Sequence, residues 1–182
     1  MKLMTKGIVA VCSLVLVTSV FAKRTAKLSN AGAASSFPAA ELEKTNPSLA
    51  SGKARAAVLA VRDGKNSVDQ RMMMVSYSPK SNELSFELGK GSSMAKEMRD
   101  GRVSILFYSD EDLSQVVFKG DARRSSKSGR ETSDWTVTPD SVYMMSASKL
   151  SGGEMSGQVT LYRFSGKDWV KSESNPRWKT IA

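Results

Sequence analysis

The chain has 182 residues and a formal net charge of +9, from 27 Lys and Arg against 18 Asp and Glu. It contains no histidine and a single cysteine, Cys12, which excludes histidine-based acid–base catalysis and any disulfide within the chain. The positive charge attracts anions such as phosphate esters. No basic stripe with interleaved aromatic residues and no nucleic-acid motif accompanies it, so we expect no nucleic-acid partner.

The N-terminus has the pattern of a secretory signal peptide. Lys2 and Lys6 precede an uncharged apolar run at residues 7–21, and Val20 and Ala22 are small residues that suit cleavage after Ala22. The run is shorter than the ~20 residues that a membrane-spanning helix needs, and an uncleaved N-terminal anchor is the alternative. We therefore expect residues 1–22 to be a signal peptide of an exported bacterial protein, periplasmic or secreted, with no stable membrane insertion after cleavage.

Residues 23–50 are predicted to hold a linker and a short helix. Residues 23–36 are rich in Ala, Ser and Lys and lack apolar periodicity, which is typical of a mobile linker. Ser36 is the expected helix cap, Pro38 suits the first turn, and Glu41 adds a favourable charge near the helix start. Asn46 before Pro47 should end the helix, because proline disfavours helical backbone at the preceding residue.

Residues 51–175 are predicted to form one mostly-β domain, followed by an unassigned tail at 176–182. In residues 83–88 the period of two places Leu84, Phe86 and Leu88 on one face. A short helix is expected at 92–99, with Met94 and Met98 on one side. Strands are expected at 56–62, 68–76, 83–88, 102–109, 113–124, 135–138, 141–146, 158–164 and 168–172, with a loop at 148–157. Many short antiparallel strands of this kind indicate a closed or partly closed β-barrel.

Four segments together resemble the flavin mononucleotide (FMN) binding half of the pyridoxamine 5'-phosphate oxidase family. They are Arg-Met-Met-Met-Val-Ser at 71–76, Gly-Ser-Ser-Met at 91–94, Arg-Val-Ser-Ile-Leu-Phe at 102–107 and Gln-Val-Val-Phe-Lys-Gly at 115–120. The resemblance spans residues 56–126 and continues more weakly over 135–173. It implies an antiparallel, Greek-key-like split β-barrel with one or two short helices, a homodimer, and FMN bound where the two subunits meet.

The resemblance also implies a set of cofactor-binding residues, namely Arg71, Met73, Ser92, Ser93 and Gln115. The planar guanidinium of Arg71 can hold two phosphate oxygens at once. Ser92 and Ser93 at a helix start offer hydroxyl and N–H donors to an anion. The main chain at Met73 would lie beside the flavin ring, and the amide of Gln115 matches the ring's polar edge. Each residue also has a purely structural alternative. Arg71 could be an exposed charge on a strand, Ser92 and Ser93 could simply cap the helix, and Gln115 could pair across strands.

Several residues depart from the family pattern. Ser76 stands where the family has a lysine, and Ser93-Met94 replaces the two cations of the family's Ser-Arg-Lys turn. The arginine and histidine that grip pyridoxine phosphate have no counterpart; Val159 stands near the position of that arginine. Met144 or Met145 stands where the family has a flavin-contacting tryptophan. We therefore do not expect pyridoxamine phosphate oxidation.

Two kinds of function remain open. The first is an FMN-dependent oxidoreductase of unknown substrate and redox partner, with no residue that we can name as catalytic. The alternative is a non-catalytic binding module on the same barrel that has lost FMN. Haem ranks behind both because histidine, its commonest axial ligand, is missing. The run Met72-Met73-Met74 is a poor copper site because adjacent strand residues point to opposite faces, so no metal site is expected.

Overall fold

The computed structural model describes residues 29–34, 36–62, 68–98, 101–109, 113–125, 131–149, 154–175 and 177–179. The predicted signal peptide lies outside these residues. The helices are α2 (Ala39–Thr45), α3 (Pro47–Ala50) and α4 (Ser93–Glu97). The strands are β1 (Ser29–Ala34), β2 (Arg55–Arg62), β3 (Val68–Ser78), β4 (Glu83–Gly89), β5 (Arg102–Ser109), β6 (Ser114–Arg124), β7 (Thr132–Lys149), β8 (Glu154–Phe164), β9 (Trp169–Ser174) and β10 (Arg177–Lys179).

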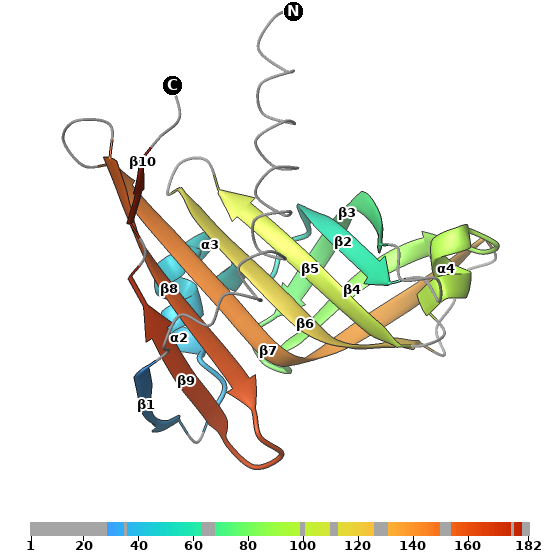
Figure 1. Cartoon of the computed structure of the whole chain (residues 1–182). Coiled ribbons are helices and arrows are strands. Elements are labelled where there is room, and N and C mark those ends of the chain that lie inside the picture. Colours follow the sequence, from blue (N-terminus) through green and yellow to red (C-terminus); the bar gives the residue numbers. More distant parts are fainter. Residues whose placement is uncertain are drawn as a thin grey trace, which may run out of the picture.

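The architecture is an antiparallel barrel of six strands with a sheet extension (Figure 1). The barrel closes through the neighbouring pairs β3–β4, β4–β7, β7–β6, β6–β5, β5–β2 and β2–β3. The extension continues from β7 through β8 and β9 to β1, and β10 pairs with β8. The predicted mostly-β barrel with short helices is confirmed. No helix among the described residues is long and apolar enough to cross a membrane.

Alternating residues of the barrel strands build the core. Leu84, Phe86 and Leu88 of β4 are 0%, 4% and 6% exposed, as their period of two predicted. On β6 the inward residues include Val116 and Phe118, both fully buried. Burial of each large apolar side chain stabilises the fold by about 1.5–3 kcal/mol, so the barrel interior supplies most of the stability.

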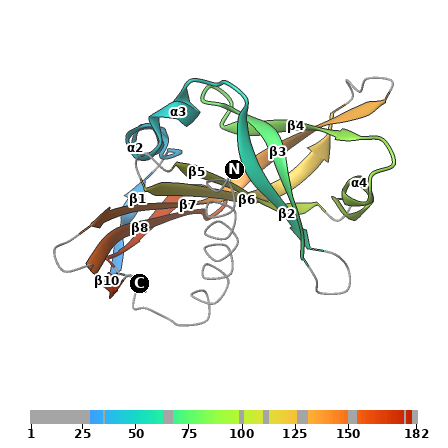
Figure 2. The same cartoon turned by 90° about the horizontal axis from the view of Figure 1, so that it is seen from above.

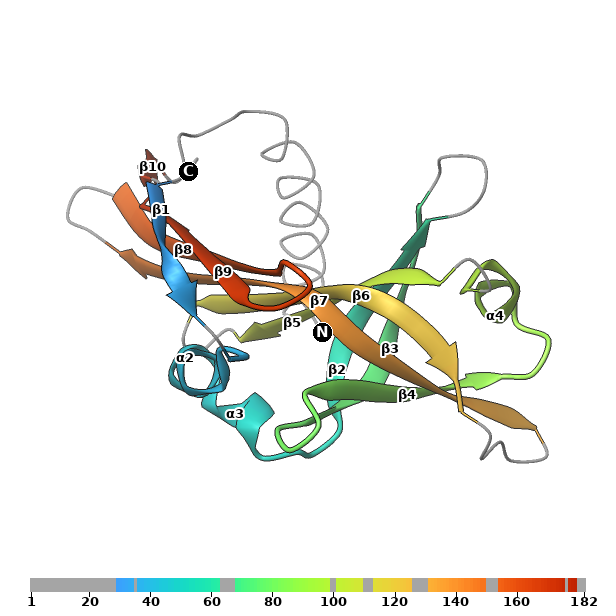
Figure 3. The same cartoon turned by 90° about the horizontal axis from the view of Figure 1, so that it is seen from below.

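The helices α2 and α3 lie together on one face of the sheet extension (Figures 2 and 3). Leu42 and Leu49 anchor them, each 1% exposed. Phe37 leads into α2 and connects the two parts of the core. Its ring stacks on Tyr77 of β3 with centroids 6.2 Å apart and meets Trp169 of β9 edge-on at 5.2 Å. Such aromatic pairs add stability beyond their buried area.

The prediction of two strands on either side of Pro139 is wrong, because β7 is one strand of 18 residues. Proline lacks a ladder N–H and is tolerated inside a sheet mainly at bulges. Here the pairing of β6 with β7 shifts register between Lys119 and Gly120, opposite the proline. The predicted loop at 148–157 is also too long, because β7 continues to Lys149 and β8 begins at Glu154.

The N-terminal predictions need two corrections. Part of the predicted linker, Ser29–Ala34, forms β1 and pairs with β9. Ser36 does not cap a helix: α2 begins at Ala39 after Pro38, without a side-chain cap. The predicted stop is confirmed, since α2 ends before Asn46. Pro47 then opens α3, because its fixed backbone angle suits a first helical residue.

The short helix and the C-terminal tail both contain regular structure. The expected helix at 92–99 is confirmed as the shorter α4, with Met94 and Met98 both buried. Part of the tail that was left without an assignment forms β10 beside β8. Both β1 and β10 form through strands that are distant in sequence, which local patterns do not report.

Candidate functional site

The structure brings Arg71 of β3 and Ser93 of α4 into contact. The Nη2 atom of Arg71 donates a hydrogen bond to Ser93 Oγ at 2.6 Å. Arg71 lies on the same side of β3 as Val75 and Tyr77 of the core, but at the end of the barrel, where its side chain is 43% exposed. The helix α4 lies at this end (Figure 1) and is anchored by the buried Met94. A cationic donor and a hydroxyl therefore meet at the barrel rim.

Ser92 has a structural role at the start of α4. Its Oγ accepts a hydrogen bond from the backbone N–H of Ala95 at 3.1 Å, which is the interaction of a helix N-cap. Gly91 precedes it with a positive φ of 90°, a conformation that favours glycine. This turn fixes the start of α4 and therefore the direction in which the Ser93 side chain projects from it. Of the two predicted serines, Ser93 contacts Arg71 and Ser92 holds the helix.

Asp69 is part of this cluster, and the sequence analysis missed it. Its Oδ2 accepts a hydrogen bond from the same Nη2 of Arg71 at 3.0 Å. The two residues are two positions apart on a strand, so they project from the same face. That spacing was the available signal. The side chain of Asp69 is 31% exposed, and the ion pair therefore lies in partial contact with water.

Met73 also projects from this side of β3. It is partly buried and packs against the barrel core. Its side chain therefore fills the interior, and its backbone lies in the β2–β3 ladder opposite Ala57. Only main-chain groups at Met73 remain for a ligand, which is the contribution that the family resemblance implies for it.

Gln115 is separated from Arg71. The residues in register across β3, β2, β5 and β6 are Arg71, Leu59, Ile105 and Phe118. Gln115 precedes Phe118 by three residues and therefore lies on the opposite face of β6. It is 1% exposed; its Nε2 donates a hydrogen bond to Met145 Sδ at 3.7 Å, and its Oε1 is buried without a hydrogen-bond partner among the described residues. Within one chain, Arg71 and Gln115 cannot hold the same ligand.

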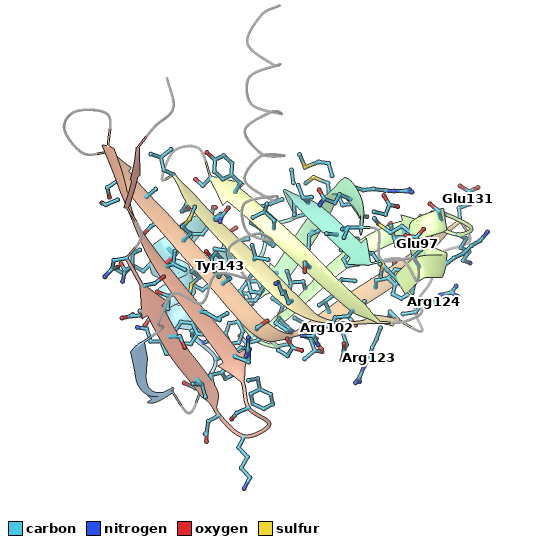
Figure 4. The ribbon with its side chains drawn as sticks, viewed as in Figure 1. Glu97, Arg102, Arg123, Arg124, Glu131 and Tyr143 are labelled. Atoms are coloured by element: carbon cyan, nitrogen blue, oxygen red, sulfur yellow. The ribbon has the colours of Figure 1, made fainter. Side chains whose placement is uncertain are left out.

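Three further polar atoms are buried without a hydrogen-bond partner, namely Glu97 Oε2, Ser114 Oγ and Trp135 Nε1. A buried polar group left unpaired costs about 1–3 kcal/mol. Glu97 matters most here because it lies on α4 one helical turn from Ser93, on the same side of the helix. It is labelled on α4 in Figure 4. Asp69 contacts Arg71 directly and Glu97 lies on the side of α4 that carries Ser93; neither carboxylate was predicted from the sequence.

The structure also shows what replaces the cations that the family resemblance led us to look for. Met94 is fully buried beneath α4 and belongs to the core. Ser76 lies on the opposite side of β3 from Arg71. In the described part of the chain, Arg71 is thus the cation that contacts Ser93, and its guanidinium is the group best suited to hold a phosphate. The donor set fits a phosphate ester provided that Asp69 can be displaced.

The perturbed titratable groups lie elsewhere. Hydrogen bonds from Lys171 to Glu173 and Glu41 raise the pKa of this lysine above its usual range. A lysine of this kind stays charged and is a structural contact rather than a nucleophile. Burial raises the pKa of Tyr77 to about 12. No group of three or more Cys, Asp or Glu side chains that could hold a metal ion is found in the ranges the structure describes.

Comparison with known proteins identifies relatives of the fold. No family model matches the sequence, and no curated protein is significantly similar to it. Among solved structures, a pyridoxamine 5'-phosphate oxidase-related, FMN-binding protein from Nostoc punctiforme matches with a TM-score of 0.57 and 15% identity, over 75% of this chain and 94% of that one. PhzG from Burkholderia lata, in complex with tetrahydrophenazine-1-carboxylic acid, matches with a TM-score of 0.58 and 15% identity, over 80% and 93%. The chain therefore has the fold of pyridoxamine 5'-phosphate oxidase-like proteins, as the sequence resemblance implied.

Proposed function

We propose that this chain binds FMN, holding the phosphate at Arg71 and Ser93, and acts as a flavin-dependent oxidoreductase of unknown substrate. The observation that carries the proposal is the 2.6 Å hydrogen bond between Arg71 and Ser93, which are 22 residues apart in the sequence. Their meeting at the rim of a barrel supports a binding role. The likeness of the fold to that of an FMN-binding protein from Nostoc punctiforme adds to this support.

Each residue would have a defined task. Arg71 would bind phosphate oxygens by charge-assisted hydrogen bonds. Ser93 would donate its hydroxyl hydrogen to the same group, while Ser92 keeps α4 in place as its cap. The amide of Gln115, whose Oε1 has no partner, would meet the polar edge of the ring. Bound FMN would supply the two-electron chemistry, and the chain would supply binding and orientation.

We further propose that the functional form is a homodimer. Arg71 and Gln115 lie on opposite faces of the sheet, so a complete set of contacts needs Gln115 from a second copy. Val68, Met72 and Met74 are 52%, 68% and 59% exposed and share the face of β3 that points away from the core. An apolar stripe of this kind is typical of a surface that another protein covers.

The alternative function is a non-catalytic binding module that has lost FMN. Two observations favour it. Asp69 already occupies the guanidinium of Arg71. Met94 is buried in the core at the place of a family cation. Purified protein that is folded but takes up no flavin would support this alternative.

We also propose that the protein is exported and cleaved after Ala22. The apolar run at residues 7–21 supports this proposal. Protein isolated from the periplasm or the medium should begin at Lys23 when its N-terminus is sequenced. Material that is found only in the cytoplasm with Met1 intact would contradict export.

The proposed FMN site is tested by an Arg71→Ala substitution. Removing one charge-assisted contact should weaken FMN binding by about tenfold or more. The measurement is a titration followed by quenching of flavin fluorescence and by visible absorbance, with circular dichroism as the check on folding. Arg163→Ala is a suitable control, because Arg163 is an exposed arginine of β8, in the sheet extension outside the barrel. Equal affinities for the wild type and the Arg71 variant would exclude the phosphate assignment.

A further inference from the structure

One nitrogen of the Arg71 guanidinium, Nη2, already donates both of its hydrogens to other residues of the chain. A guanidinium Nη2 carries two hydrogens. In this chain the same Nη2 donates to Asp69 Oδ2 at 3.0 Å and to Ser93 Oγ at 2.6 Å. Both contacts come from residues of the chain itself, so Nη2 has no hydrogen left for a ligand.

This arrangement limits how a phosphate can bind. A guanidinium grips two oxygens through one of two forks, formed by Nη1 with Nη2 or by Nε with Nη2. Both forks include Nη2. A phosphate can therefore be held by two parallel hydrogen bonds only after Asp69 or Ser93 gives up its place.

Asp69 is the group that must leave. A serine hydroxyl can rotate and donate its own hydrogen to a phosphate oxygen, so Ser93 can take part in binding. An ionised carboxylate only accepts, and its negative charge repels a dianion at short range. The backbone of Asp69 is paired with Val61 in the β2–β3 ladder, but its side chain is 31% exposed. The Asp69 side chain can therefore rotate so that its carboxylate points toward solvent, while the backbone of β3 stays unchanged.

We propose that Asp69 is a specificity-determining residue that competes with the phosphate for Arg71. The inference rests on the proposed function, because it concerns the same site. An anion that binds Arg71 has to replace the existing ion pair with Asp69. A small anion that makes no other contact with the protein therefore gains little binding free energy. An ester whose remaining atoms make further contacts can still bind. Asp69 therefore lowers the affinity of Arg71 for any phosphate, so that an ester held by further contacts still binds while free inorganic phosphate is excluded.

Other charged groups nearby do not reverse this selection. Glu97 lies one turn along α4 from Ser93 and adds a second negative charge. Lys96 of α4 is exposed and its charge is screened by solvent. The carboxylate in direct contact with the guanidinium is that of Asp69, so its removal should have the largest effect on anions.

The test compares Asp69→Asn and Asp69→Ala with the wild type, using isothermal titration calorimetry with FMN, riboflavin and inorganic phosphate. Because the pair is partly exposed, FMN should bind roughly two- to fivefold more tightly to the variants. Riboflavin, which lacks the phosphate, should bind them equally. Inorganic phosphate should gain at least as much as FMN. The control is Asp140→Asn, since Asp140 also pairs with an arginine, Arg102, at 2.6 Å, and the change in net charge is the same.

The outcomes separate this inference from the proposed function. If FMN binds the wild type and binds the Asp69 variants equally or more weakly, Asp69 positions Arg71 instead of competing, and the inference is wrong. If no form binds FMN, but inorganic phosphate binds Asp69→Asn and not the Asp69→Asn, Arg71→Ala double variant, the inference stands and the FMN proposal fails. If neither FMN nor inorganic phosphate binds any of the folded variants, both are wrong.

Discussion

Lys171 of β9 holds together a cluster of charged and aromatic groups away from the candidate site. Its Nζ lies 2.8 Å from Glu41 Oε1 of α2 and 2.7 Å from Glu173 Oε1, and it sits over the ring of Tyr162 at 5.7 Å. The contact with Glu41 joins residues 130 positions apart. Partly exposed pairs of this kind contribute about 0.2–1 kcal/mol each. The cluster holds α2 against the sheet extension.

The pH dependence of stability should reveal the contact between Glu41 and Lys171. Burial alone would raise the pKa of Glu41, but hydrogen bonds with Lys171 and Tyr162 outweigh it and lower the pKa below its ordinary value of 4.5. A carboxyl with a lowered folded-state pKa adds stability above its unfolded value and loses it as pH falls through the folded value. We expect Glu41→Gln to cost about 0.5 kcal/mol at pH 7 and less as the pH falls below 4.5.

Urea unfolding at pH 7 and at pH 3 measures this difference. Glu43→Gln is the control, because Glu43 lies on the same helix, is exposed, and makes no ion pair within the described ranges. A deficit of Glu41→Gln that is as large at pH 3 as at pH 7 would show that the carboxylate charge is not what stabilises the contact.

At the scale of elements, β7 organises the molecule. Its first half pairs with β4 and closes the barrel, and its second half carries β8 and the sheet extension. The strand passes through Pro139 because β6 changes register opposite it, between Lys119 and Gly120. Gly120 is needed at this bulge: a Cβ there would collide with the backbone of Thr138 and of Pro139.

We expect Gly120→Ala to destabilise the fold by about 1–3 kcal/mol, because the added methyl group overpacks a rigid backbone contact. Chemical denaturation gives the free energy of unfolding. The matched control is Gly89→Ala at the end of β4, where a Cβ would meet no atom within 4 Å, and which should change stability by no more than about 0.5 kcal/mol. Equal stabilities of the two variants would mean that β6 and β7 do not approach each other as described.

At the scale of the whole molecule, the two sides of β3 have different tasks. One side faces the core through Val75 and Tyr77, which are 0% and 2% exposed, and carries Arg71 at the rim. The other side presents Met72 and Met74 to solvent. A single copy exposes this apolar stripe and leaves Arg71 and Gln115 on opposite faces. A second copy would cover the exposed stripe and would bring its own Gln115 to the ligand held at Arg71, which is why we propose the dimer.

The proposed dimer predicts that charge on this stripe disrupts assembly. Met74→Glu should shift the protein from dimer to monomer, because a charged group cannot be buried unpaired at an interface. It should also weaken FMN binding, since Gln115 of the second copy is then lost from the site. Light scattering after size-exclusion chromatography measures the mass. Val170→Glu is the control, an exposed apolar residue of β9 that is 38% exposed; a dimer that survives Met74→Glu would argue against this face.

Much of the barrel could be predicted from the sequence, because the pattern that defines a strand is local. The alternation of Leu84, Phe86 and Leu88 specifies a half-buried strand without any knowledge of its neighbours. The same local pattern places Arg71 on one side of its strand. The absence of histidine likewise limits the chemistry in any fold.

The pairing of distant segments could not be predicted in this way. The strand β1 exists because it lies beside β9, and β7 continues through Pro139 because its pairing with β6 skips the next residue, Asp140. In the same way, Ser93 and Asp69 share one nitrogen of Arg71 only because α4 packs at the end of the barrel. The sequence by itself determined which residues alternate between core and solvent and which side chains are available for an anion. The tertiary structure decided which of them meet, because those contacts depend on packing between segments that no short-range pattern connects.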